Sequence, residues 1–166
     1  MSFEALLDTM TELNDIHNSL LELAEQKRHV LIHNQVEQLM QIVTKENKLL
    51  KRIGELEVQR VEVTGAFLME KGYKPNPRVT ISDLTKILFN IEDKKLLLDK
   101  QKELAASIRK LRELNRVNQQ MIEHSLAYID YSLDLIVGPP EDQFVYKNPQ
   151  AAASGPKRQG MFDSRA

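Results

Sequence analysis

The sequence predicts an all-α protein: a coiled-coil-like antiparallel bundle of three long helices with a flexible C-terminal tail. Aromatic residues make up only 5% of the 166 residues, tryptophan is absent, and glycine and proline number six each. This composition is typical of long helices. Apolar residues also recur every three or four positions over most of the chain, which is the spacing of one helix face. Segments 72–77 and 138–140 hold six of the twelve Gly and Pro residues, which stop helices.

The first helix is predicted over about 2–33, with Ser2 as a candidate N-cap and Glu4 in the first turn. No Gly or Pro interrupts it. Its apolar stripe consists of Phe3, Leu6, Leu7, Met10, Leu13, Ile16, Leu20, Leu23, Ala24, Val30 and Leu31.

The second helix is predicted over about 35–71, because the stripe loses phase at 33–35 and Asn34 can cap a new helix. Two interpretations remain, a tight hairpin and one continuous bent helix. The hairpin is favoured, since a single amphipathic rod could not bury its stripe without a partner chain. Gly54 and Gly65 lie inside this helix. Each costs about 1 kcal/mol relative to Ala, which indicates close helix–helix approach. The second stripe comprises Val36, Leu39, Met40, Val43, Leu49, Leu50, Ile53, Leu56, Val61, Phe67 and Leu68.

The third helix is predicted over about 82–137, after a loop in which Gly72 supplies a left-handed C-cap. Residues 80–83 offer caps for its start or for a short turn. The phase slips near Asn90, which indicates a kink or short break. Residues 1–137 are therefore expected to form the bundle, and 138–166 a flexible tail that binds a partner.

The end of the third helix carries more apolar residues than one core-facing stripe needs. One stripe is Ile122, Leu126, Ile129, Leu133 and Ile136, and a second, expected to run beside it, is Met121, His124, Tyr128, Tyr131 and Leu135. An amphipathic helix needs one apolar stripe for its own core, so the surplus indicates a partner.

Five of the nine aromatic residues lie in the last quarter of the chain: Tyr128, Tyr131, Phe144, Tyr146 and Phe162. Tyrosine suits interfaces because it combines a large apolar area with a polar tip. The alternative is that the two helical tyrosines cap the end of the bundle.

Composition argues against several kinds of function. The net charge is −1 with a pI of about 6.4, and the basic residues between Lys94 and Arg116 alternate with acidic ones and lack interleaved aromatics, so nucleic acid is not an expected partner. There is no Cys, and no phosphate loop, nucleophile elbow or dinucleotide fingerprint. No carboxylate sits in an apolar stretch that would raise its pKa. We therefore expect no catalytic residue and no cofactor.

Two polar pairs leave alternatives open. His29 and His33 lie four apart, near Glu25 and Glu37, a spacing that can hold zinc. A catalytic zinc helix would also carry Glu beside the first His, where Arg28 and Val30 stand, so no metal is expected. Asn115 and Asn118 either fix helix register at a core position or rotate to the edge of the apolar stripe.

The N-terminus is acidic and lacks the regions of a signal peptide, and no apolar run approaches the length needed to span a bilayer. A cytoplasmic location without stable membrane insertion is expected.

The pattern resembles the FlgN family of flagellar type III export chaperones, of the Gram-positive type. Leu56-Glu57-Val58-Gln59-Arg60 is similar to the family's Leu-Glu-x-x-Arg element. Asn115 and Asn118 followed by the apolar helix end are similar to its Asn-x-x-Asn segment. The tail, Tyr146 followed by a Gly/Pro/Ala-rich stretch and the last six residues, 161–166, is similar to the ends of Gram-positive members.

The resemblance implies a cytoplasmic chaperone that binds hook–filament junction proteins of the FlgK and FlgL type. It implies that the chaperone prevents their premature assembly and delivers them to an export-gate component of the FlhA type. It also implies that the end of the third helix and the tail form the binding surface. The alternative is a structural coiled-coil adaptor that uses the same stripes to self-associate. The expected partner-binding residues are Met121, Leu126, Tyr128, Ile129, Tyr131, Leu133, Leu135, Ile136, Phe144, Tyr146, Met161 and Phe162.

Overall fold

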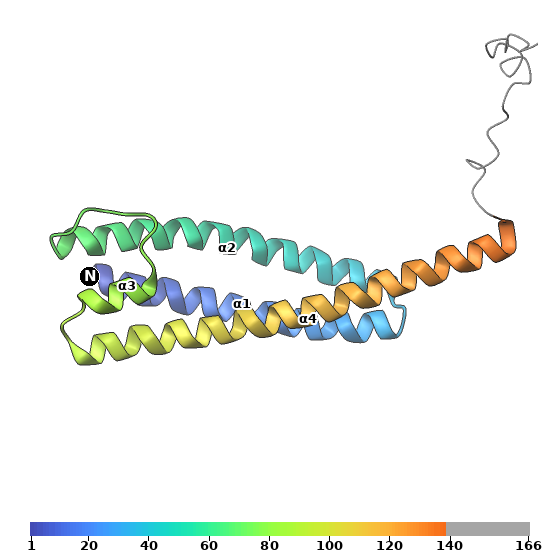
Figure 1. The fold of residues 1–166 in the computed structure, drawn as a ribbon, viewed down its shortest axis with the longest axis horizontal. Helices are drawn as coiled ribbons and strands as arrows, with labels where there is room; N and C mark the ends of the chain where they lie inside the picture. Colours follow the sequence, from blue (N-terminus) through green and yellow to red (C-terminus); the bar gives the residue numbers. More distant parts are fainter. Residues whose placement is uncertain (139–166) are drawn as a thin grey trace, which may run out of the picture. The chain divides into compact units, whose positions relative to one another are not determined.

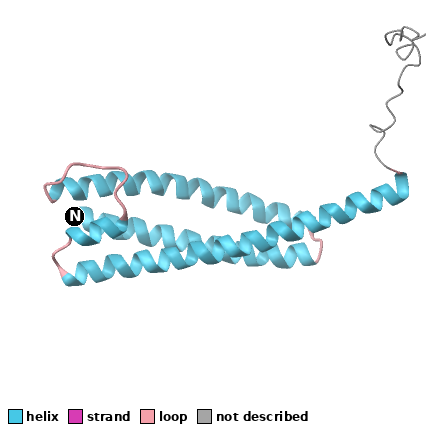
Figure 2. Ribbon diagram, viewed as in Figure 1, coloured by secondary structure: helices cyan, strands magenta, loops and turns pink. Residues whose placement is uncertain are grey.

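The structure is a computed structural model that describes residues 1–138, and these residues form four α-helices and no strand (Figures 1 and 2). The prediction of an all-α chain is confirmed. Contacts between Cα atoms divide the chain into two units, Met1–His124 and Ser125–Ala166. We call the first the core unit and the described part of the second, residues 125–138, the terminal segment. The helices are α1 (Ser2–Ile32), α2 (Val36–Glu70), α3 (Ile81–Ile87) and α4 (Ile91–Val137).

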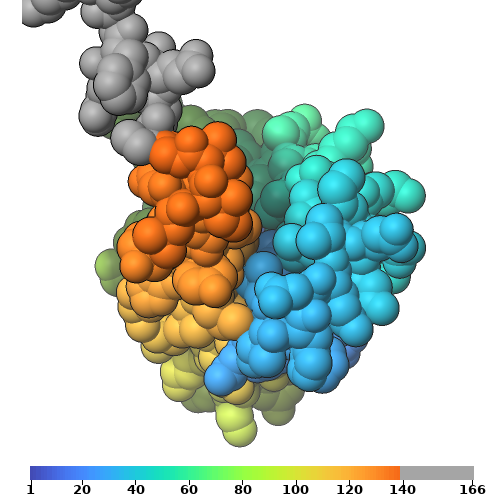
Figure 3. All heavy atoms as spheres, turned by 90° about the vertical axis from the view of Figure 1, so that its right-hand side faces the viewer, coloured from blue at the N-terminus to red at the C-terminus, as the bar shows by residue number. Residues whose placement is uncertain are grey.

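The chain reverses between α1 and α2, so the hairpin interpretation is correct. Asn34 adopts a positive φ of 53°, a conformation that Asn tolerates better than most residues. Its N–H and that of Gln35 donate to the carbonyls of Leu31 and Val30, which closes α1 with a Schellman motif. Asn34 therefore ends α1, and the prediction that it caps α2 is wrong. Figure 3 views this turn end-on, with the end of α1 and the start of α2 in blue to cyan.

Gly72 ends α2 as predicted. Its φ is 80°, and its N–H and that of Tyr73 donate to the carbonyls of Met69 and Leu68. Ser2 does not have its predicted role, because the N-cap of α1 is Met1 and the Ser2 hydroxyl donates instead to Glu70. Ser2 thus ties the start of α1 to the end of α2.

The segment predicted as one helix over 82–137 contains two. Leu88 leaves the helical conformation at ψ 124°, and the Asn90 carboxamide oxygen accepts a hydrogen bond from the Glu92 N–H at 2.9 Å. An Asn side chain that caps a helix in this way starts a new one. The slip in apolar phase near Asn90 therefore marks a real break, and the long helix begins at Ile91.

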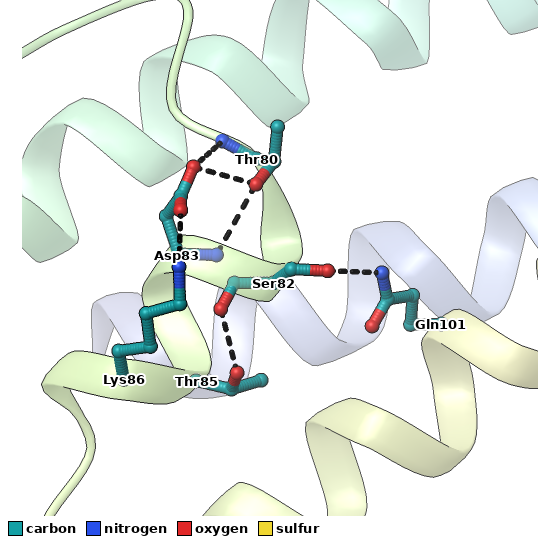
Figure 4. A network of polar contacts seen from close by, with 6 residues as sticks. All are labelled: Thr80, Ser82, Asp83, Thr85, Lys86 and Gln101. Carbon is teal, nitrogen blue, oxygen red and sulfur yellow. Dashed lines mark hydrogen bonds and ion pairs between the residues drawn. The ribbon is translucent and has the colours of Figure 1, made fainter.

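A capping box fixes the short helix α3 (Figure 4). The Thr80 hydroxyl accepts from the Asp83 N–H, and the Asp83 carboxylate accepts from the Thr80 N–H and hydroxyl. The hydrogen bonds that the Asp83 carboxylate accepts, first from the Thr80 hydroxyl, then from Lys86 and from the Thr80 N–H, lower the pKa of Asp83 from 3.8 to about 2. Gln101 of α4 donates to the Ser82 hydroxyl at 2.8 Å, so α3 is tied to α4 as well as capped.

The core unit is held together by apolar clusters that join its helices. The largest contains buried residues from all four helices and from Leu88, and a second joins α1 to α2 with Leu104 of α4 packed against it. A third joins the last turns of α1 to the first turns of α2. The first of these clusters comprises Leu6, Met10, Phe67, Leu68, Leu84, Leu88 and Leu97.

Polar contacts give the directions of the helices within the core unit. Arg52 bonds Glu12 at 2.6 Å, and Lys27 bonds Glu46 at 2.6 Å, so α1 and α2 run in opposite directions. The Ser107 hydroxyl of α4 donates to Asn18 of α1 at 2.9 Å. Together with the bond between Asn118 and the carbonyl of Ala24, this shows that α4 runs alongside α1 in the same direction (Figure 1).

The apolar stripe predicted for α2 is only partly buried. Leu56, Phe67 and Leu68 are buried, whereas five members of the stripe are exposed. The close helix–helix approach expected at the glycines is also wrong: a Cβ at Gly54 would meet nothing within 4 Å, and one at Gly65 would meet Pro75 of the following loop at 3.7 Å. The five exposed members are Val36, Met40, Val43, Leu50 and Val61.

Candidate interaction surface

The terminal segment exposes all of its large apolar side chains. Seven of the predicted partner-binding residues lie in it, and each is between 51% and 81% exposed. Folding normally removes such side chains from water, and each Å² of apolar area that is buried stabilises the fold by about 25 cal/mol. A run of them left uncovered indicates a surface that another molecule covers. These residues are Leu126, Tyr128, Ile129, Tyr131, Leu133, Leu135 and Ile136.

These side chains occupy two separate faces of the helix. At 3.6 residues per turn each residue advances by about 100°, which places the two groups roughly 150° apart around the axis. The prediction that the second stripe runs beside the first is therefore wrong, because the two lie on nearly opposite sides. We call the group Leu126, Ile129, Leu133 and Ile136 the aliphatic face, and the group Tyr128, Tyr131 and Leu135 the tyrosine face.

Polar residues separate the two faces along both edges. Asp130 and Asp134 form an acidic edge on one side, and Ser125 and Ser132 form a serine edge on the other. The Ser132 hydroxyl donates to the carbonyl of Tyr128 at 2.9 Å, so it serves its own helix. The structure thus presents one aliphatic and one aromatic face, divided by an edge of carboxylates.

The remaining predicted partner-binding residues do not belong to this exposed group. Met121 lies in the core unit and is half-buried. The other four, Phe144, Tyr146, Met161 and Phe162, lie outside the described residues.

Of the two positions that the sequence left open, the core and the edge of the apolar stripe, Asn118 takes the first and Asn115 the second. Asn118 is 2% exposed, and its carboxamide nitrogen donates to the carbonyl of Ala24 at 2.9 Å. Asn115 is exposed at the edge. The Asn118 carboxamide oxygen is buried without a partner in the described part of the chain. Because an unpaired buried acceptor costs free energy, Asn118 fits a residue that fixes register at some expense of stability.

His29 lies in the last turn of α1 and His33 is the C-cap of that helix. The rings of His29 and His33 are 4.2 Å apart between centroids, and His33 Nδ1 lies 2.8 Å from the carbonyl oxygen of His29. Within residues 1–138, no three His, Cys, Asp or Glu side chains come close enough together to hold a metal ion. The two rings are tilted at 42° to each other, and His33 is hydrogen-bonded to the helix backbone.

Sequence reasoning missed a second exposed apolar face, on α2. Met40, Val43, Leu50, Val58 and Val61 are all exposed, and their spacing places them on one side of the helix. Gly54 lies in the same row, beside open space. The signal was present in the sequence, since α2 has more apolar residues than one core-facing stripe requires.

The described residues thus define an all-α protein with uncovered apolar helix faces. The comparisons with known proteins place it more closely. A protein-family profile described as "FlgN protein" matches residues 1–154, and the chain belongs to the FlgN family. The chain is also 30% identical over 167 aligned positions to "Uncharacterized protein YvyG" of Bacillus subtilis (strain 168), over the full length of both chains.

No solved structure matches the chain. Across residues 1–138, none of the helices combines the length and the apolar character that crossing a bilayer requires.

Proposed function

We propose that this protein is a cytoplasmic flagellar export chaperone that binds hook–filament junction proteins of the FlgK and FlgL type. Membership of the FlgN family supports a role in flagellar export. The observation that carries the proposal is the exposure of seven apolar side chains on the terminal segment. In this proposal α1, α2 and α4 form an antiparallel three-helix bundle, and the terminal segment is the cargo surface.

The physical reasoning concerns the cargo as much as the chaperone. Subunits that assemble through helices expose apolar helix faces until they reach their final position, and such faces associate prematurely. A helix that docks on an exposed apolar face removes that surface from water. We propose that residues 138–166, with Phe144, Tyr146, Met161 and Phe162, complete the contact, and that the loaded chaperone then meets an export-gate component of the FlhA type.

The test is binding to purified FlgK- and FlgL-type proteins by isothermal titration calorimetry. The parent chain should bind, and Tyr128→Ala with Leu135→Ala should weaken binding at least tenfold, since each large side chain contributes about 1.5–3 kcal/mol when buried. The melting temperature should not change, because both side chains are exposed. Met40→Ala with Val58→Ala is the matched control, since it removes exposed apolar side chains from α2 and should bind as the parent does.

A folded Tyr128/Leu135 variant that binds cargo as tightly as the parent would show that the tyrosine face is not the cargo surface. If the parent chain binds neither the FlgK-type nor the FlgL-type protein, the proposed function is refuted.

The second candidate function is a structural adaptor that self-associates, and the exposed apolar face of α2 favours it. Sedimentation of the purified chain separates the two. A stable dimer that dissociates on Met40→Ala with Val58→Ala would support the adaptor, whereas a monomer that binds cargo would support the chaperone.

A further inference from the structure

The terminal segment carries negative charge and no positive charge. The sequence contains no Lys or Arg from position 117 to position 138, and within 125–138 the charged residues are Asp130 and Asp134. Both carboxylates are exposed, and neither makes an ion pair with another residue in the described part of the chain. This charge pattern differs from that of the core unit, where Arg52, Arg60 and Arg116 each pair with Glu.

The two carboxylates lie beside both apolar faces, where a helix docked on either face would contact them. They lie four residues apart and therefore one turn above each other. They occupy the acidic edge between the aliphatic face and the tyrosine face, about 100° from the centre of each at 3.6 residues per turn. A helix docked on either face would place the flank of its own apolar stripe against Asp130 and Asp134.

From this placement we infer that the terminal segment selects an amphipathic helix whose apolar face is flanked by Lys or Arg, and that this helix docks on the aliphatic face of Leu126, Ile129, Leu133 and Ile136. The inference rests on the proposed function in taking the terminal segment as the cargo surface, and it adds the chemistry of the helix that the surface accepts. Apolar contact supplies most of the affinity, and the acidic edge supplies selectivity and faster association. The exposed rings of Tyr128 and Tyr131 also favour a nearby cation.

The same charges disfavour other occupants. A second copy of the segment would bring Asp130 and Asp134 of both chains together, with no Lys or Arg in either segment to neutralise them. An anionic membrane surface or a nucleic acid would also be repelled. The charge pattern therefore favours a basic helix over a like copy.

The experiment uses the full chain and two synthetic helical peptides with the same Leu and Ile face. One peptide carries Lys on the flanks of that face and the other carries Glu. Binding is measured by fluorescence anisotropy at about 0.01 M and about 1 M salt, where the screening length falls from roughly 30 Å to roughly 3 Å. The Lys peptide should bind about tenfold more tightly than the Glu peptide at low salt, because replacing Lys by Glu converts weak exposed ion pairs into repulsions. The difference should fall below about twofold at high salt.

Two variants assign the effect to the segment. Asp130→Asn with Asp134→Asn should remove the preference between the peptides and retain the binding that the apolar face provides. Glu37→Gln with Glu62→Gln makes the same change in net charge at two exposed positions of α2 without a described ion pair, and should keep the preference. Leu126→Ser with Leu133→Ser should weaken binding of both peptides.

Several outcomes would overturn the inference: equal binding of the two peptides, a preference that survives in the Asp130/Asp134 variant, or a dimer in sedimentation that the Leu126/Leu133 variant abolishes. Cargo that binds without any effect of salt or of the Asp130/Asp134 variant would also overturn it, while the proposed function would stand. If the Lys peptide binds selectively and the FlgK- and FlgL-type proteins do not bind, the inference holds and the proposed function fails.

Discussion

Leu56 and Leu133 provide a direct test of which apolar residues hold the fold and which are free for a partner. Both are leucines inside long helices, but Leu56 is 0% exposed and Leu133 is 52% exposed. Leu56 packs with Leu13 and Ile16 in a cluster that joins α1 and α2. Leu133 lies on the aliphatic face of the terminal segment.

Leu56→Ala should lower the free energy of unfolding by about 3 kcal/mol, because it removes buried surface and leaves a cavity between two helices. For a domain of this size that loss lowers the melting temperature by roughly 10 °C. Leu133→Ala should change the free energy by less than about 0.5 kcal/mol, since half of the side chain is already in water and Ala and Leu are both good helix formers.

Urea unfolding followed by far-ultraviolet circular dichroism measures both values, and cargo binding should follow the opposite order. Leu133→Ala is expected to lose cargo affinity while keeping its stability. Equal destabilisation by the two substitutions would refute the reasoning, because Leu133 would then be part of the folded core and unavailable to a partner.

Three further predictions concern the core unit. Asn118→Leu removes a buried unpaired oxygen and should leave the stability within about 1 kcal/mol of the parent or raise it, whereas Asn118→Ala should lower it by about 2 kcal/mol, as urea unfolding would measure. Lys27→Met leaves Glu46, whose side chain is 13% exposed, without its partner at 2.6 Å; it should cost about 2 kcal/mol, and adding Glu46→Leu should recover most of that loss in a double-mutant cycle. Because the pKa of Asp83 is lowered from 3.8 to about 2, its stabilising contribution is fully present above pH 3.8 and is lost as the pH falls through about 2. Titration of the Asp83 carboxyl by NMR should show that Thr80→Val raises this pKa toward its ordinary value.

The sequence predicted α1 better than α2, and the reason is physical. Eight of the eleven stripe residues predicted for α1 are buried, and they lie on one face. In α2 the apolar residues occupy more than one face, and periodicity alone does not say which face a neighbour covers. Burial of Leu56 and exposure of Leu50 depend on where α1 and α4 lie, which is a property of the tertiary structure.

Helix ends also differ in how far the local sequence predicts them. Gly72 was predictable because two prolines follow closely and Gly adopts a left-handed C-cap easily. Asn34 was assigned to the wrong helix, because Asn is favourable both as an N-cap and as a left-handed residue that ends a helix. Its φ of 53° decides between the two roles, and no local pattern contains that angle. The weak phase slip at Asn90 marked a break, but only the bond from Glu92 shows that Asn90 starts α4.

Seven of the twelve predicted partner-binding residues are exposed on the terminal segment, and the helical period that divides them into two faces was already present in the sequence. An excess of apolar residues at the end of α4 indicated a partner, yet their division into two opposite faces changes what that partner must be. One docked helix covers about a third of the circumference of another helix, so in the proposed complex a helix on the aliphatic face leaves Tyr128, Tyr131 and Leu135 for a second contact with the same cargo. Tyrosine suits this second contact because its ring packs on the cargo while its hydroxyl remains hydrated. The aliphatic face has no such polar groups and gains most from being covered. A helix that first docks there, guided by Asp130 and Asp134, therefore accounts for both faces and for the acidic edge between them.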